Sequence, residues 1–229
     1  MGIRRGEITT DIVRNGLVFN MDPANRASYV PNATTSFNTI DLSQSGTLEN
    51  GVNFIQPPIS ASCWDFDGID DYIDFGVGAN NLILGNVPCT IASWFNMGSH
   101  STWALAFVVG TAGSQQSFWL GASNTYKIAG GLYGYNIISN INSETGWHYV
   151  ALTYDTTIMR LYIDGVQNST RAESSANIAN NSIIFARTNS GLEYWYNGNM
   201  GNSHIYNRTL SAEEVLHNYN ALKGRFGLT

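Results

Sequence analysis

The sequence predicts an all-β protein, a two-sheet antiparallel jelly-roll sandwich with one short C-terminal helix. Apolar and polar residues alternate with period two from Leu17 to Tyr206, and Gly, Asn, Asp and Ser interrupt the alternation as turns do. Helical periodicity is confined to the C-terminal end. The 229 residues fit one large sandwich with a sizeable core. We therefore expect a single domain over residues 16–229, preceded by an N-terminal arm of residues 1–15.

The composition narrows the possible functions. The chain is 43% hydrophobic and 12% aromatic, which is typical of a folded protein, while only 12% of its residues are charged. A net charge of -6 and 11 scattered basic residues give no attraction for phosphate backbones, so nucleic acid is not an expected partner. The N-terminus lacks the apolar stretch of a signal peptide, and no run of about 18 apolar residues exists, so we expect neither an export signal nor a membrane span.

The alternation marks individual strands. The candidates are residues 17–21, 62–66, 72–75, 90–97, 104–109, 117–120, 147–154, 159–163, 183–186 and 199–206. This many strands in one chain imply two packed sheets. The stretch 147–154 is apolar on both faces, which predicts a central strand, and Asp164-Gly165 supplies a later hairpin turn because glycine tolerates positive φ.

The C-terminal segment predicts a helix over residues 211–223. Ser211 and Glu214 form a capping box, in which each side chain accepts a backbone N–H of the other residue. One face then carries Val215, Tyr219 and Leu222. Gly224 is expected to close the helix in a left-handed conformation, and the apolar face is expected to pack against the sandwich edge.

The densest acidic stretch is residues 65–74, with five carboxylates. Hard cations bind clustered oxygen ligands, so Asp67, Asp70 and Asp71 are candidate calcium ligands, although the spacing is not that of an EF-hand. The alternative is a β-turn at Asp67-Gly68 that aspartate side chains cap. In that case the neighbouring aromatic residues pack inward, namely Trp64, Phe66, Tyr72 and Phe75.

No residue is predicted to be catalytic. Each of the four histidines lies in a different segment without a zinc-ligand spacing, and no nucleophile elbow is present. Glycoside hydrolysis needs two carboxylates across the sugar bond, and only Asp65 and Asp67, beside a turn, share a strand face. We therefore expect a protein that is not an enzyme.

Aromatic residues in polar surroundings are the remaining functional signal, because sugar rings stack on Trp and Tyr. The glycan-binding candidates are Trp103, Tyr133, Tyr135, Tyr194, Trp195 and Tyr196. Alternation places Trp195 opposite to Tyr194 and Tyr196, so at least one side of this stretch is expected to face outward. The alternative is burial between the sheets or in cross-strand pairs.

Two smaller features carry predictions. Cys63 and Cys89 are expected to be buried free thiols, and a disulfide between them is the alternative. Arg4 and Arg5 with Arg14 form a small basic arm, a candidate for docking on an acidic neighbouring protein. A solvated terminus is the other interpretation of this arm.

Four motifs resemble a known superfamily in order and spacing. They are residues 65–73, 90–95, 146–154 with 161–165, and 205–211. Together they resemble the laminin G-like, concanavalin A-like lectin/glucanase superfamily over residues 16–222. The stretches 16–25 and 214–227 are similar to the version of this domain in structural proteins of tailed bacteriophages. Relatives often bind calcium through a carboxylate just before the motif that begins at Ile205, but here Gly201 stands where an aspartate is common.

The resemblance leads to three functional hypotheses. The first is a non-enzymatic virion surface protein, a capsid decoration or cement protein located on the particle. Its partners would be the major capsid protein or another virion protein, further copies of itself in a homo-oligomer, and host-surface glycans. The second is a carbohydrate-binding receptor-recognition module of a fibre, or a lectin. The third is a glycoside hydrolase. No cofactor is expected, apart from the calcium considered above.

Overall fold

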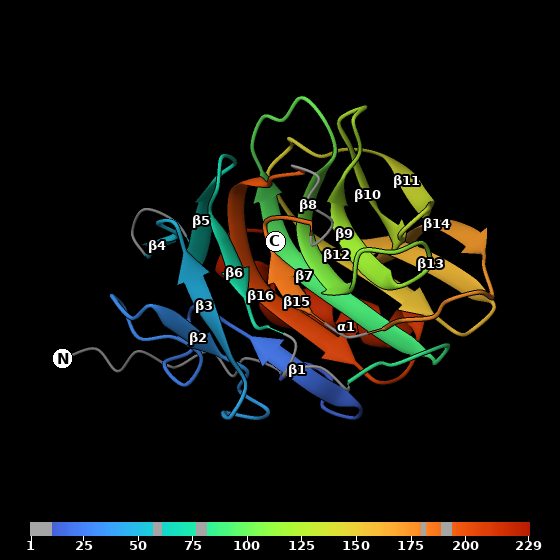
Figure 1. Ribbon diagram of the computed structural model, residues 1–229, viewed down its shortest axis with the longest axis horizontal. Helices are drawn as coiled ribbons and strands as arrows, with labels where there is room; N and C mark the ends of the chain where they lie inside the picture. Colours follow the sequence, from blue (N-terminus) through green and yellow to red (C-terminus); the bar gives the residue numbers. More distant parts are fainter. Residues whose placement is uncertain (1–10, 57–60, 77–81, 180–181, 189–193) are drawn as a thin grey trace.

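Two β-sheets packed face to face form the body of the molecule (Figure 1). The computed structural model describes residues 11–56, 61–76, 82–179, 182–188 and 194–229. The back sheet consists, in spatial order, of β14 (Val166–Ala172), β13 (Ile158–Ile163), β12 (Trp147–Tyr154), β7 (Cys89–Met97), β16 (Asn197–Tyr206), β5 (Cys63–Asp67) and β4 (Asn53–Ile55), with β1 (Leu17–Met21) also pairing with β16. The front sheet consists of β11 (Tyr135–Asn142), β10 (Lys127–Leu132), β9 (Ser117–Ala122), β8 (Ala104–Gly110), β15 (Ile183–Phe185), β6 (Tyr72–Asp74), β3 (Ser45–Glu49) and β2 (Thr35–Phe37).

Alternation along the strands builds the core between the sheets. In β9, Phe118 and Leu120 point inward and are almost fully buried. Phe107 of β8 and Phe185 of β15 stack with ring centroids 4.7 Å apart. The predicted jelly-roll sandwich is therefore confirmed. Cys63 and Cys89 are buried thiols that no disulfide joins, as predicted.

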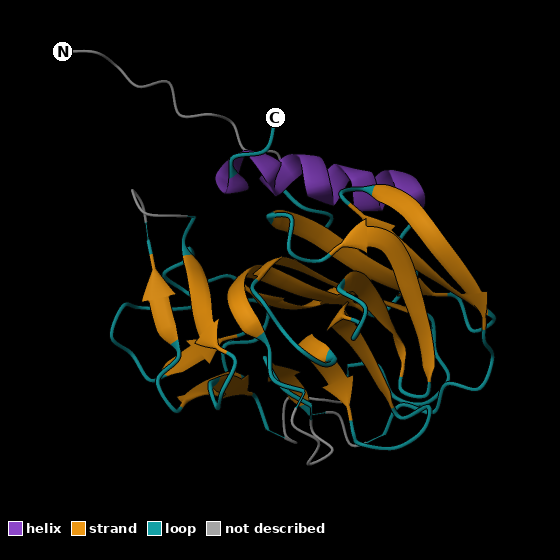
Figure 2. Cartoon of the chain, turned by 90° about the horizontal axis from the view of Figure 1, so that it is seen from above, coloured by secondary structure: helices purple, strands orange, loops and turns teal. Residues whose placement is uncertain are grey.

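The helix α1 (Ala212–Leu222) begins at the predicted capping box, with Ser211 as N-cap. Figure 2 shows it lying across one sheet. Val215 packs there against a second apolar cluster that includes Trp94 of β7 and Tyr149 of β12. The expectation that the helix packs on the sandwich edge is wrong, because the outward face of the back sheet carries large aromatic side chains that the helix removes from water.

The end of the helix also differs from the prediction. Gly224 does not close it, because the chain continues as a 3₁₀-helix η2 (Lys223–Phe226), and Gly227 is the left-handed residue, with φ of 75°. This extra turn brings Phe226 onto Trp94, at a centroid separation of 4.3 Å and an interplanar angle of 16°. Burial of one more aromatic ring therefore accounts for the later stop.

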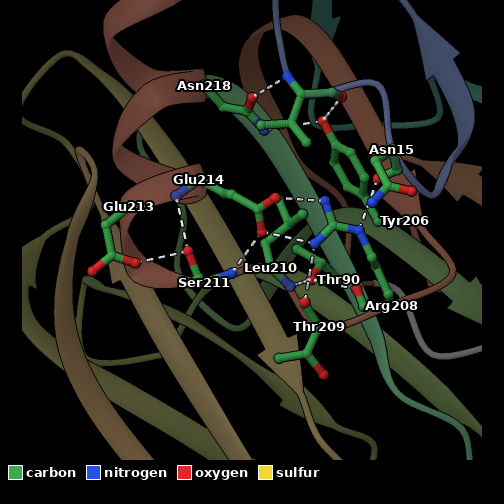
Figure 3. Close-up of polar contacts among 11 residues, drawn as sticks. Asn15, Thr90, Tyr206, Arg208, Thr209, Leu210, Ser211, Glu213, Glu214 and Asn218 are labelled. Carbon is green, nitrogen blue, oxygen red and sulfur yellow. Dashed lines mark hydrogen bonds and ion pairs between the residues drawn. The ribbon is translucent and has the colours of Figure 1, made fainter.

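The N-terminal segment is tied to this helix (Figure 3). Asn218 accepts a hydrogen bond from the Val13 N–H at 2.8 Å, and the Tyr206 hydroxyl donates to the Val13 carbonyl at 2.9 Å. Arg208 donates to the Asn15 carbonyl at 2.8 Å and forms two 2.7 Å bonds to Glu214. The described end of the predicted arm is thus held on the domain.

The basic residues of that arm are placed only in part. Arg14 is exposed and pairs with Asp11 at 2.7 Å, so its charge is locally compensated. Arg4 and Arg5 lie outside the described residues. Within the described ranges, no helix has the length and apolar character needed to cross a membrane.

Candidate functional site

The outer face of the front sheet carries a small apolar cluster. Leu105 and Val108 of β8, Trp119 of β9 and Ala129 of β10 are buried there together. Trp119 points outward because its neighbours Phe118 and Leu120 point into the core. The helix covers only the back sheet, so a different part of the chain packs on this cluster.

Trp103 and Tyr194 pack on the cluster from loops. Trp103 meets Trp119 edge to face, with ring centroids 5.6 Å apart and an interplanar angle of 84°. The Leu105 N–H donates to the Tyr194 carbonyl at 3.2 Å, which fixes the loop that carries Tyr194 beside β8. The aromatic rings therefore have defined positions before any ligand binds.

These residues line a cavity of about 270 Å³, which we call the first pocket. Its lining consists of Trp103, Leu105, Trp119, Tyr133, Gly134, Asn136 and Tyr194. Tyr133, Gly134 and Asn136 come from the hairpin between β10 and β11. The pocket thus combines four aromatic side chains, two tryptophans and two tyrosines, with the amide residue Asn136, an arrangement typical of sites that bind small polar molecules with one apolar face.

Three predicted glycan-binding residues meet in the first pocket: Trp103, Tyr133 and Tyr194. Sequence reasoning missed Trp119, whereas Asn136 belongs to the stretch 131–136, whose mixture of tyrosine and asparagine is that of a glycan-binding segment. The alternation of β9 could have revealed Trp119, because a tryptophan between two inward residues must face outward. Tyr135 lies outside the lining, with its ring partly buried against the core and the Arg171 guanidinium 5.1 Å from its centroid.

Trp195 lies in a second pocket, of about 480 Å³. This pocket is lined by Asp67, Gly68, Ser99, His100, Ser101, Thr102, Trp195 and Asn197. The green connection between β7 and β8 at the top of Figure 1 supplies the residues from Ser99 to Thr102. Hydroxyl, amide and carboxylate groups therefore surround one aromatic ring.

Tyr196 is not a surface residue, which corrects its prediction as a glycan-binding residue. Its side chain is fully buried, and its hydroxyl donates to the carbonyls of Asn96 and Asn199 at 3.1 and 2.8 Å. Burial raises its pKa well above the usual value. Residues 194–196 precede β16 and are not in a strand, so Tyr194 and Tyr196 face different surroundings.

The acidic turn is capped by aspartate side chains, as one of the two interpretations of the sequence predicted. Asp67 accepts the Ile69 N–H at 2.8 Å, and Asp71 accepts the Asp67 N–H at 3.2 Å, so aspartates cap a turn in which Gly68 has φ of 76°. Carboxylate oxygens of Asp67, Asp70 and Asp71 also lie within 4.8 Å of one another. Burial, followed by the neighbouring carboxylates, raises the pKa of Asp71. Calcium binding at this turn stays a prediction. If calcium is bound, a chelator should lower the midpoint of thermal unfolding.

The aromatic residues around this turn follow the prediction with one exception. Trp64, Phe66 and Phe75 are buried. Tyr72 is only partly buried, and the Arg187 guanidinium lies 3.7 Å from its ring centroid. Tyr72 also lies near Trp195, with ring centroids 6.3 Å apart, so it supports the second pocket from outside its lining.

The calcium position that the family resemblance implies does not fit this chain. A Cβ added to Gly201 would lie 2.6 Å from a ring carbon of Phe226 and 3.2 Å from Trp94. An aspartate at position 201 would therefore collide with the aromatic stack under the C-terminal 3₁₀-helix. Glycine at position 201 therefore leaves the space in which the Phe226 ring stacks on Trp94.

Solved structures share the fold at low sequence identity. The receptor binding domain of botulinum neurotoxin D matches with a TM-score of 0.66 and 13% identity, over 90% of this chain and 52% of that one. The binding domain of Paraclostridial Mosquitocidal Protein 1 gives 0.71 and 15%, over 93% and 55%. Trypanosoma rangeli sialidase in complex with sialic acid gives 0.69 and 12%, over 94% and 34%. The chain thus spans about half or a third of these proteins.

No curated protein sequence matches the chain. A family model, by contrast, matches residues 67–216, and it describes the concanavalin A-like lectin/glucanases superfamily. This range contains most of the four motifs and runs from the acidic turn into the C-terminal helix. The chain belongs to the concanavalin A-like lectin/glucanases superfamily.

Proposed function

We propose that this lectin-like domain binds glycans in the first pocket and does not catalyse a reaction on them. The observation that carries the proposal is the meeting of Trp103 and Tyr194, both partly buried, over the almost fully buried Trp119 on the outer face of the front sheet, in a pocket that Asn136 also lines. A sugar ring has an apolar face of C–H groups and a polar edge of hydroxyls. Aromatic rings match that face, and an amide can both donate to and accept from the hydroxyls.

The structural neighbours support this proposal at the level of their names. One is the receptor binding domain of a neurotoxin, another is the binding domain of a mosquitocidal protein, and the third is a sialidase in complex with sialic acid. All three share only the fold with this chain, so the glycan and its position are inferred from the pocket itself.

The experiment is titration calorimetry with glycans selected on an array. Trp103→Ala is expected to weaken binding by about tenfold or more, since truncating a central aromatic contact costs on the order of 1–2 kcal/mol. Trp103→Phe should retain part of the affinity. Leu42→Ala is the control. It removes an apolar side chain that is 58% exposed, in the loop between β2 and β3 at the edge of the front sheet opposite to β11, and the variant should bind as the wild type does. An array without any bound glycan would contradict the proposal.

The absence of catalysis is tested separately. Incubation with the bound glycan should release no reducing sugar. Release that Asp67→Asn abolishes would instead support the glycoside hydrolase hypothesis.

The role on a virion surface is a second proposal, supported by the resemblance of residues 16–25 and 214–227 to phage structural proteins. In that role the domain would decorate the capsid, dock on the major capsid protein and present the first pocket to host glycans. The test is the copy number in purified particles. A decoration protein should approach the copy number of the major capsid protein, whereas a receptor-recognition module on a fibre would be present in far fewer copies.

A further inference from the structure

The two pockets lie on either side of one ridge. The ridge is built from residues 99–103 and 194–197, and at one place in each segment the lining passes from one pocket to the other between two consecutive residues. Thr102 lines the second pocket and Trp103 the first; Tyr194 lines the first and Trp195 the second. Since neighbouring Cα atoms are about 3.8 Å apart, a single peptide unit separates the two pockets at each crossing.

From this arrangement we propose that the two pockets are adjacent subsites for one uncharged oligosaccharide chain. The proposal rests on the proposed glycan-binding function and adds the size and charge of the ligand. One sugar unit would stack in the first pocket, and a later unit of the same chain would lie against Trp195 in the second.

Hydrogen bonds hold the ridge in place. The Gly98 N–H donates to the Asn197 carbonyl at 2.8 Å, and the Asn197 side chain donates to the Ser99 carbonyl at 3.2 Å. At its other end the Leu105–Tyr194 bond joins the same two segments. The relative position of Trp103 and Trp195 is therefore set by the protein, which lowers the entropic cost of binding both sugar units at once.

The second pocket has the chemistry of a sugar subsite. Trp195 supplies an aromatic ring, Asp67 a carboxylate that accepts hydrogen bonds, and Asn197 an amide. Ser99, Ser101 and Thr102 add hydroxyl groups, and Gly68 and His100 complete the lining. A carboxylate accepts bonds from sugar hydroxyls more strongly than a neutral group does.

Charge around the second pocket decides the ligand class. Asp67 lines it, and the carboxylates of Asp70 and Asp71 lie within 4.8 Å of that of Asp67. No Lys or Arg occurs among the described residues that line either pocket. The one histidine of the linings, His100, has a side chain only 4% exposed, with its Nδ1 3.5 Å from the Glu144 carboxylate and its Nε2 3.1 Å from the Ser123 carbonyl oxygen. A sialic or uronic acid in the second pocket would therefore meet the like charge of Asp67 without a lysine or arginine to compensate it, whereas a neutral sugar would not.

The test is titration calorimetry over two neutral series, the oligomers of β-1,4-linked glucose and those of β-1,4-linked N-acetylglucosamine, each from the monosaccharide to the hexasaccharide. Affinity should rise by about tenfold or more once the chain is long enough to reach both pockets. Trp195→Ala should remove this increase. Trp103→Ala should weaken every member of the series.

The charge is tested with lactose and 3′-sialyllactose. Lactose should bind more tightly than its sialylated counterpart. Asp67→Asn should reduce this difference in affinity, because it removes a negative charge from the second pocket. The turn should be retained, since the asparagine oxygen can still accept the Ile69 N–H. Asp41→Asn is the matched control, since Asp41 is another exposed aspartate that accepts the N–H two residues later, at 3.0 Å from Ser43. It should leave the ratio unchanged.

The outcomes separate the two proposals. Monosaccharide binding with no gain from chain length, or a gain that Trp195→Ala leaves intact, overturns the adjacent subsites while the glycan-binding function stands. Equal or tighter binding of 3′-sialyllactose overturns the uncharged ligand. Failure of every sugar to bind overturns the glycan-binding function as well.

Discussion

A buried histidine between the back sheet and the helix should make stability depend on pH. His204 of β16 is fully buried, and neither ring nitrogen has a hydrogen-bond partner among the described residues. Tyr149 and Tyr206 contact it, with ring centroids 6.4 and 6.2 Å away. Burial lowers its pKa from 6.5 to about 3, while the charges of Asp22 and Arg225 act in opposite directions. The folded protein therefore keeps His204 neutral.

The sign and size of the effect follow from linkage. Below pH 6.5 the unfolded chain binds a proton at this position and the folded chain does not, down to a pH of about 3. The stability that depends on a neutral His204 is therefore fully present above pH 6.5 and is lost as the pH falls below that value. At about 1.4 kcal/mol per pH unit, acidification from about pH 7 to about pH 4.5 should cost roughly 2.5 kcal/mol at this position.

The assay is urea unfolding at a series of pH values, comparing wild type with His204→Leu. The variant should lose less stability over that interval, by about 2 kcal/mol, whatever its stability at neutral pH. His217→Gln, at an exposed histidine of α1, should keep the wild-type dependence. Parallel pH profiles for wild type and His204→Leu would refute the reasoning.

Three further predictions concern the packing beneath the helix and the acidic turn. Gly201→Ala should lower the free energy of unfolding by about 1–3 kcal/mol, since its Cβ would meet the Phe226 ring. Gly224→Ala is the control and should leave that free energy unchanged, because nothing lies within 4 Å of the added Cβ. The thermal midpoints of the two variants are compared by calorimetry. Glu214→Gln should cost about 1 kcal/mol in chemical denaturation, because glutamine retains the capping box but loses the charge pair with Arg208. Asp71→Asn should raise the thermal midpoint at neutral pH, because burial and neighbouring carboxylates raise the pKa of Asp71 and so disfavour its charged form. A lower midpoint would contradict this and favour a bound cation.

Strands buried on at least one face were predictable from alternation. The bounds of β1 and β12 match the prediction, as does the hairpin turn, where Asp164 and Gly165 have φ of 52° and 81°. Six strands were missed, namely β2, β3, β4, β10, β11 and β14. Most of these are short or polar and lie toward sheet edges, where burial imposes little pattern on the sequence.

The β10–β11 hairpin shows why the first pocket was only partly predictable. Gly130 and Gly131 interrupt the alternation of apolar side chains, so the sequence did not indicate β10 as a strand. In the structure a Cβ at Gly131 would lie 2.5 Å from the Tyr135 carbonyl oxygen of β11, so glycine permits the close pairing of the two strands. The sequence indicated which aromatics belong to polar surroundings. It could not show that Trp103, Tyr133 and Tyr194 converge, because long-range sheet pairing brings them together.

The two described ends of the chain lie on the same side of the molecule. Asp11 accepts a hydrogen bond from His217 of the helix at 2.8 Å, and Leu228 packs in the cluster beneath that helix. Figure 2 shows the C-terminus beside the helix, whereas the first pocket opens on the outer face of the other sheet. A tether at the C-terminus, such as an affinity tag on a sensor chip, would thus leave the aromatic pocket directed away from the support and accessible to ligand.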